Sequence, residues 1–139
     1  MYKRQAQAKQ DGHDRAQAWG ATVLDCPMSG TGQQARDGDL VAYLSGEDEA
    51  KQRALPVLAA FTRAQYDLGP FGRGTAMKLV ANLLVAVHNA AAAEALLLAQ
   101  RAGLDLDDVL TAVGDGAGGS RMLQVRGPLM AEGQSLIHI

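Results

Sequence analysis

The spacing of apolar residues changes near residue 70 of the chain. Before this point, short apolar runs alternate with clusters of Gly, Pro, Asp and Ser, a pattern typical of strands and helices joined by turns. After it, apolar residues dominate from residue 75 to residue 101, which predicts one helix of about 27 residues and about 40 Å. The predicted order is a helix ending at 14–19, strands at 21–25 and 40–44, a helix from 47 to about 61, a strand at 65–68, and helices at 75–101, 105–113 and 120–128. The predicted fold class is therefore α/β followed by all-α.

The glycines and proline at residues 69–74 mark the change between the two patterns. Because such clusters interrupt regular structure, we predict one domain over residues 6–69 and a second over residues 70–134. The terminal segments, 1–5 and 135–139, continue neither pattern. We expect both to be artefactual ends of an incomplete reading frame.

Composition excludes several classes of function. The 139 residues carry a formal charge of −2, so no basic field favours a nucleic-acid partner. A single cysteine excludes a disulfide framework and a cysteine-rich zinc site, and the three histidines lack metal-ligand spacing, so we expect no metal. One Trp, three Tyr and two Phe against 16 Gly favour closely packed helices over an all-β sandwich.

The stretch 79–99 is long and apolar enough to raise the question of a membrane span. It contains Asn82, His88 and Glu94, and alanine fills much of the remainder, which disfavours insertion. We therefore expect a buried or interface helix and no membrane partner. The polar residues 1–10 show no secretory signal, and we expect a cytoplasmic protein.

Lys78 and Asn82 lie one turn apart on the predicted long helix, on the same face. They form a narrow polar stripe on an otherwise apolar helix, and both could contact one small molecule. The same pattern fits a lysine whose amine extends to water beside an unrelated asparagine, so the spacing alone leaves both interpretations open.

Small residues follow the predicted strand 21–25 directly, in the sequence Cys-Pro-Met-Ser-Gly-Thr-Gly. A turn of this kind can direct several backbone N–H groups at one anion, and the hydroxyl of Ser29 adds a donor. Ligands of open α/β sheets bind at the carboxyl ends of strands. Gly, Ser and Thr are also the ordinary residues of a turn, so this segment alone is compatible with either function or none.

Together these segments resemble the β-hydroxyacid dehydrogenases, the 3-hydroxyisobutyrate dehydrogenase group related to 6-phosphogluconate dehydrogenase. Residues 25–32, Asp-Cys-Pro-Met-Ser-Gly-Thr-Gly, are similar to the family's substrate-binding turn. Residues 72–82, Gly-Arg-Gly-Thr-Ala-Met-Lys-Leu-Val-Ala-Asn, are similar to its catalytic segment, Gly-x-Gly-x-x-x-Lys-x-x-Asn-Asn, with Ala81 replacing the first asparagine. The resemblance extends over residues 14–131.

The resemblance implies the last strands and helices of a Rossmann-type domain joined to the first helices of an all-α domain. Family members are about twice as long as this chain, beyond a typical single domain. Their Gly-x-Gly-x-x-Gly dinucleotide turn is not found, and the glycine-rich loop 114–119 follows a predicted helix, not a strand. We therefore expect an internal fragment that is inactive alone and whose cofactor-binding residues are unknown.

The implied reaction is hydride transfer between NAD or NADP and a small 3-hydroxy acid resembling 3-hydroxyisobutyrate. By resemblance, Lys78 transfers the proton of the hydroxyl group, and Asn82 orients the substrate. Ser29, Gly30 and Thr31 bind the substrate carboxylate. The family also implies a homo-oligomer formed through the helical domain.

Two alternatives remain open at this point. A relative of the same fold could reduce an imine or tartronate semialdehyde. The chain could also be a non-enzymatic helical interaction module, in which the alanine-rich long helix is the face that contacts a partner.

Overall fold

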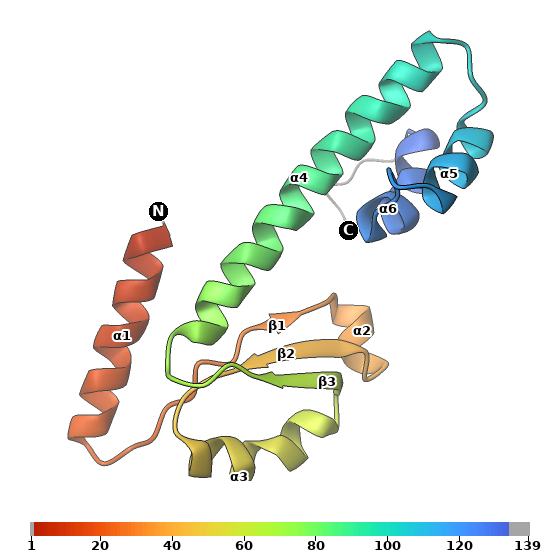
Figure 1. Cartoon of the computed structure of the whole chain (residues 1–139). Coiled ribbons are helices and arrows are strands. Elements are labelled where there is room, and N and C mark those ends of the chain that lie inside the picture. Colours follow the sequence, from red (N-terminus) through yellow and green to blue (C-terminus); the bar gives the residue numbers. More distant parts are fainter. Residues whose placement is uncertain (1, 134–139) are drawn as a thin grey trace. The chain divides into compact units, whose positions relative to one another are not determined.

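The computed structural model describes residues 2–133 (Figure 1). Residue 1 and residues 134–139 lie outside the described part, and with them most of the predicted artefactual ends. The chain divides into two compact units, Met1–Ala81 and Asn82–Ile139, which are described separately. The predicted succession of α/β elements followed by helices alone is confirmed.

A three-stranded sheet in the order β1-β2-β3 forms the centre of the first unit. The strand β1 (Met28–Ser29) runs antiparallel to β2 (Leu40–Leu44), and β2 runs parallel to β3 (Thr62–Asp67). Parallel neighbours need a crossover, and α3 (Asp48–Ala59) supplies it, packing against β3 on one face of the sheet (Figure 1). Alternate residues of β2 are buried: Leu40, Ala42 and Leu44.

The predicted strand at 21–25 is wrong. In this stretch only Asp25 pairs, in an isolated antiparallel bridge with Ser45. The ladder resumes at Met28 opposite Ala42 in the same register. The interruption falls at Pro27, which has no N–H to donate but whose carbonyl still accepts from the N–H of Tyr43 at 3.0 Å. The paired strand therefore lies after the proline, not before it.

Two further helices complete the first unit. The first, α1 (Tyr2–Ala18), ends before Gly20, whose φ of 73° is the left-handed conformation typical of a helix C-terminus. The second, α2 (Gly32–Arg36), was not predicted. Its signal was present: Thr31 and Gln34 form a capping box, the Thr-x-x-Gln pattern of a helix start.

The second unit contains the greater part of α4 (Arg73–Arg101), followed by α5 (Leu106–Asp115) and α6 (Arg121–Ala131). The predicted caps are present, because Asp105 accepts from the N–H groups of Asp107 and Asp108, and Ser120 accepts from the N–H of Leu123. A side chain at Gly127 would collide with Leu110, so glycine permits α6 to pack against α5. Its helix continues past Pro128 to Ala131.

The expectation that the long helix is buried is not met in this chain. Only 11% of its most apolar 18-residue stretch is buried, and large side chains such as Leu83 and Leu98 are exposed. By length and composition α4 could cross a membrane, although core helices of soluble proteins meet the same criteria. The expectation of an interface helix remains a prediction.

Candidate functional site

The carboxylate of Asp25 is buried, with 1% of the residue exposed, and binds the first turn of α4. It accepts hydrogen bonds from the backbone N–H of Thr75 at 2.6 Å and from the Thr75 hydroxyl at 2.7 Å. The ammonium group of Lys9, on α1, donates a third at 2.5 Å. The hydroxyl of Ser45 is a fourth donor, at 3.4 Å, so one buried charge is satisfied on several sides, as a buried carboxylate requires.

Ser45 binds the neighbouring amide of the same helix. Its hydroxyl oxygen accepts from the N–H of Gly74 at 2.9 Å and donates to the backbone carbonyl of Asp25 at 3.0 Å. The first N–H groups of a helix have no partner within the helix, so these two residues satisfy groups that α4 cannot satisfy itself. We call Asp25, Ser45, Gly74 and Thr75 the α4 clamp.

Gly74 lets the helix lie directly on the backbone of the sheet edge. A Cβ atom at this position would lie 2.5 Å from the carbonyl oxygen of Tyr43, 2.6 Å from that of Asp25 and 2.9 Å from Cδ of Pro27. No residue with a side chain fits at such distances. The start of α4 therefore lies against residues 25–27, which lead into β1 and the Ser29 turn.

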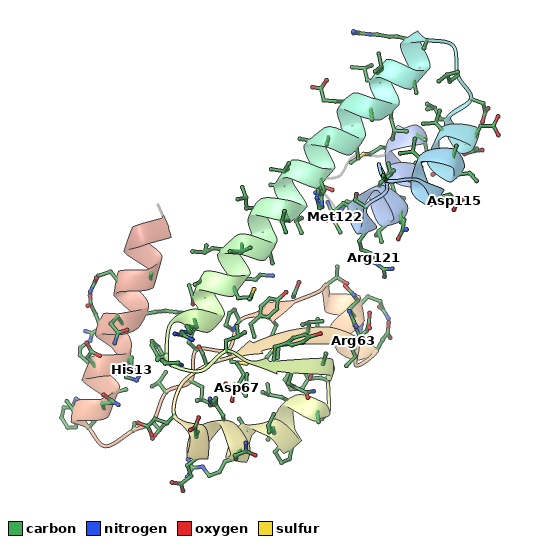
Figure 2. The ribbon with its side chains drawn as sticks, in the orientation of Figure 1. His13, Arg63, Asp67, Asp115, Arg121 and Met122 are labelled. Carbon is green, nitrogen blue, oxygen red and sulfur yellow. The ribbon has the colours of Figure 1, made fainter. Side chains whose placement is uncertain are left out.

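The loop that enters α4 is held from two other directions. Figure 2 labels Asp67 at the end of β3. Buried Lys51, on α3, forms an ion pair of 2.6 Å with Asp67, and Asp67 in turn accepts from the N–H of Gly69 at 2.8 Å. Phe71 packs against His13 of α1, with ring centroids 4.1 Å apart and ring planes tilted by 36°. These contacts place the helix start independently of Lys78.

The three turn residues predicted to bind a carboxylate differ in how free they are. The N–H of Thr31 donates to Oε1 of Gln34 at 3.0 Å, and the Thr31 hydroxyl accepts from the N–H of Gln34 at 3.3 Å. Gly30 has a φ of 140°, a backbone conformation that glycine adopts readily and other residues rarely do. Ser29 is the last residue of β1. Within the described residues the Ser29 hydroxyl has no hydrogen-bond partner, which leaves it available to a ligand.

Lys78 is half-buried on α4, on the turn after Gly74 and within the first unit. Asn82 is exposed and is the first residue of the second unit. Their spacing of four residues on one continuous helix is the spacing that places two side chains on one face. The first unit thus contains Lys78 and the Ser29 turn, and the clamp joins the elements that carry them.

The hydrogen bonds also determine the charge at the clamp. Burial by itself would raise the pKa of Asp25, but the donors from Lys9 and Thr75 outweigh it and hold that pKa below its ordinary value. Burial, and then the charge of Asp25, raise the pKa of the Cys26 thiol, against an opposing effect of Lys9. A protonated thiol is a poor nucleophile, so Cys26 is not a candidate catalytic group.

A dinucleotide cradle is not formed by the described residues. Residues 30–35 have the sequence Gly-x-Gly-x-x-Ala and follow a strand. That strand, β1, has only two residues and pairs antiparallel with β2, so it does not begin a βαβ unit. The glycine-rich loop 114–119 joins α5 to α6. Among residues 2–133, no group of three His, Cys, Asp or Glu side chains could hold a metal ion.

Family comparisons account for almost the whole chain. A family model described as the NAD-binding domain of 6-phosphogluconate dehydrogenase matches residues 3–69. A second, described as the NAD-binding of NADP-dependent 3-hydroxyisobutyrate dehydrogenase, matches residues 72–136. The two models follow each other along the chain and describe related dehydrogenases.

Curated relatives of this chain include a reductase and a dehydrogenase. Glyoxylate/succinic semialdehyde reductase 2 of Arabidopsis thaliana is 36% identical over 80% of this chain and 31% of its own length. L-threonate dehydrogenase of Escherichia coli is 38% identical over 86% of this chain and 40% of its own length. The chain therefore spans less than half of the relatives it matches.

Solved structures agree with these matches. A structure described as 3-hydroxyisobutyrate dehydrogenase from Salmonella typhimurium superposes with a TM-score of 0.82 and 35% identity, covering 92% of this chain and 45% of the other. Psf3, solved in complex with NADP+ and 2-OPP, gives a TM-score of 0.85 and 25% identity, covering 94% of this chain and 46% of the other.

Proposed function

Because the chain belongs to the β-hydroxyacid dehydrogenase family, we propose that it carries the substrate turn and the proton-transferring lysine of an NAD(P)-dependent oxidoreductase acting on a small hydroxy acid. The observation that carries this proposal is the α4 clamp, which joins the helix of Lys78 to the segment that enters the Ser29 turn. The substrate class is a 3-hydroxy acid resembling 3-hydroxyisobutyrate.

The turn binds the carboxylate of the substrate in this proposal. The free hydroxyl of Ser29 and the backbone N–H groups around Gly30 are the donors, since a carboxylate accepts several hydrogen bonds. Thr31 contributes its hydroxyl hydrogen only, because its N–H is already bound to Gln34. Ser29 is therefore the principal carboxylate ligand among the three.

Lys78 moves the proton of the reacting hydroxyl. Its amine takes this proton as the alcohol is oxidised and returns it when the carbonyl is reduced, which is general acid–base catalysis. The amide of Asn82 forms a hydrogen bond with the reacting oxygen of the substrate or with an adjacent oxygen, and so limits the orientations of the substrate. NAD or NADP, when bound, accepts or supplies the hydride. We assign no residue of this chain to the nucleotide.

Replacing Lys78 by alanine in a chain extended to the length of its relatives tests this function. The turnover number for a hydroxy acid should fall by about 10² to 10⁴, the usual contribution of general acid–base catalysis. Met77→Ala is the matched control, because its side chain is on the same helix and partly exposed. Turnover of Lys78→Ala within tenfold of the parent would exclude Lys78 as the proton-transfer group.

The substrate itself is separated by parallel assays. We expect oxidation of 3-hydroxyisobutyrate or a close analogue to exceed oxidation of L-threonate and reduction of glyoxylate or succinic semialdehyde. A preference for an imine or for tartronate semialdehyde would retain the reaction type and replace the substrate class.

Self-association is a second proposal, supported by the exposed apolar face of α4. Leu83, Leu84, Val87 and Leu98 are all exposed on this helix, more apolar surface than monomers usually leave uncovered. We propose that the helical domain joins copies of the protein. Light scattering should give a mass above that of one chain, and Leu83→Glu should lower it; a monomeric mass at all concentrations would exclude this.

A further inference from the structure

The start of α4 is capped by residues far away in the sequence. Thr31, Asp105 and Ser120 each cap their own helix through N–H groups two or three residues ahead. In α4 the residue before Arg73 is Gly72, which has no side chain to act as a cap. The first amides are bound instead by Asp25 and Ser45, at separations of 50 and 29 residues.

A remote cap does something that a local cap does not. Either kind satisfies the unpaired N–H groups at a helix start. Only a remote cap also fixes where the helix lies relative to another segment of the chain. Here the other segment is residue 25, four residues before Ser29 in the sequence.

We propose that Asp25 and Ser45 are positioning residues that set the place of Lys78 relative to the Ser29 turn. The proposal rests on the proposed function and assigns residues that touch neither substrate nor cofactor. Lys78 follows Thr75 by three residues, about 4.5 Å along the helix axis, so the anchored amides are within one turn of it.

The contact at Gly74 removes the room for adjustment. With backbone oxygens of Tyr43 and Asp25 2.5 and 2.6 Å from the position of a Cβ, the helix cannot move closer. The hydrogen bonds to Asp25 and Ser45 prevent it from moving away. A displacement of about 1 Å at a catalytic group can cost about 10²-fold in rate, so losing the clamp should lower turnover.

Charge makes Asp25 the stronger half of the clamp. Its carboxylate is negative at the N-terminal end of α4, where the helix dipole is positive. Lys9 of α1, which donates to the carboxylate of Asp25, also donates to the hydroxyl of Thr75 at 2.9 Å. An asparagine at position 25 keeps the volume and one acceptor oxygen but removes the charge and places an NH₂ group opposite these donors.

The test compares Asp25→Asn with Asp105→Asn in the enzyme extended to the length of its relatives. Asp105 also accepts two helix N–H groups, but within its own helix. We expect Asp25→Asn to unfold more easily, whereas Asp105→Asn should change stability little, because asparagine caps a helix about as well as aspartate. Asp25→Asn alone should lower kcat, by about 10- to 10²-fold, with the substrate KM within about threefold. An unchanged kcat, or an equal loss in Asp105→Asn, would overturn the proposal.

A double mutant distinguishes positioning from general damage. If Asp25 acts through Lys78, Asp25→Asn should cost less than about twofold once Lys78→Ala is present, because interacting positions are non-additive. Undiminished loss in that background would contradict the inference. Where Asp25→Asn does not fold, Ser45→Ala is the second variant: it removes the hydroxyl that accepts from Gly74 and donates to Asp25, keeps the Asp25 carboxylate, and should show the same pattern. If Lys78→Ala itself leaves turnover intact, the proposed function fails first; if only the Asp25 and Ser45 variants are silent, this inference alone fails.

Discussion

The backbone N–H of Thr75 donates a hydrogen bond of 2.6 Å to the carboxylate of Asp25, fifty residues earlier in the chain. This bond joins the segment that enters β1 to the first turn of the long helix. It also makes the stability of the first unit depend on the charge of one buried group.

Acid should therefore weaken the folded chain through Asp25. The pKa of Asp25 is lower in the folded chain than the value of about 3.9 in an unfolded chain. The ionised carboxylate thus stabilises the fold fully above about pH 5, and this contribution is lost as the pH falls through the folded pKa. Urea unfolding of the parent and Asp25→Asn should differ most near neutral pH and converge in acid.

Ser120→Ala is the control for this pH dependence. It removes the uncharged cap bond to the N–H of Leu123 on α6, which involves no residue bonded to Asp25, so its destabilisation should be nearly the same near neutral pH and in acid. If the difference in free energy of unfolding between the parent and Asp25→Asn stayed constant into strong acid, the direction given for the pKa of Asp25 would be wrong.

Gly74→Ala should destabilise the chain severely. The new methyl group would meet two carbonyl oxygens and the ring of Pro27, so α4 must shift and the clamp must break. Overpacking of this kind typically costs about 1–3 kcal/mol. Gly12→Ala is matched to it, because Gly12 lies within α1 with open space around its Cβ position.

The two glycine variants should change thermal stability in opposite directions. Alanine is the better helix former, so Gly12→Ala should stabilise by up to about 1 kcal/mol. Calorimetry or circular dichroism measures both. A Gly74→Ala chain as stable as the parent would show that the start of α4 is not held against residues 25–27.

Ser29 and Thr31 should differ in what their alanine variants lose. Ser29 has a free hydroxyl, and hydrogen bonds to charged groups contribute about 1.5–3 kcal/mol, so Ser29→Ala should raise the substrate KM by about tenfold or more. Thr31 caps α2, so Thr31→Ala should cost about 1 kcal/mol of stability and change KM less. Steady-state kinetics of the extended enzyme, with an unfolding curve for each variant, would decide; the reverse order would assign the carboxylate to Thr31.

The Cys26 thiol should react slowly with iodoacetamide. Burial and the charge of Asp25 raise its pKa, which lowers the thiolate fraction near neutral pH. Asp25→Asn removes that charge and should accelerate alkylation of the folded chain. Since Cys26 is the only cysteine, mass spectrometry reads the rate directly. If Cys26 of the parent chain reacted as fast as the amino acid cysteine in solution, the direction given for its pKa would be wrong.

The 139 residues by themselves should not turn over substrate. The described part of the chain forms no dinucleotide cradle, so NAD(P) should bind weakly and no hydride transfer should be measurable. The extended enzyme, assayed at equal concentration, is the positive control. Measurable NAD(P)-dependent activity from the short chain would contradict the assignment of residues 6–69 as only the last part of the nucleotide domain.

Several features of the fold were predictable from the sequence because the signals that specify them lie in neighbouring residues. The strand at Leu40–Leu44, the caps at Asp105 and Ser120, and the helix end at Gly20 each follow from the chemistry of neighbouring positions. The motif around Lys78 was visible for the same reason, since its residues share one helix.

Long-range pairing decided the rest. The sequence predicted a strand before Pro27, whereas the ladder forms after it, because the missing N–H matters only once β2 lies alongside. From the sequence, Asp25 is the last residue of a predicted strand and the first of the substrate-binding turn, and no functional role is predicted for Ser45. Their shared role at the start of α4 depends on contacts across 50 and 29 residues, which only folding brings within hydrogen-bond distance.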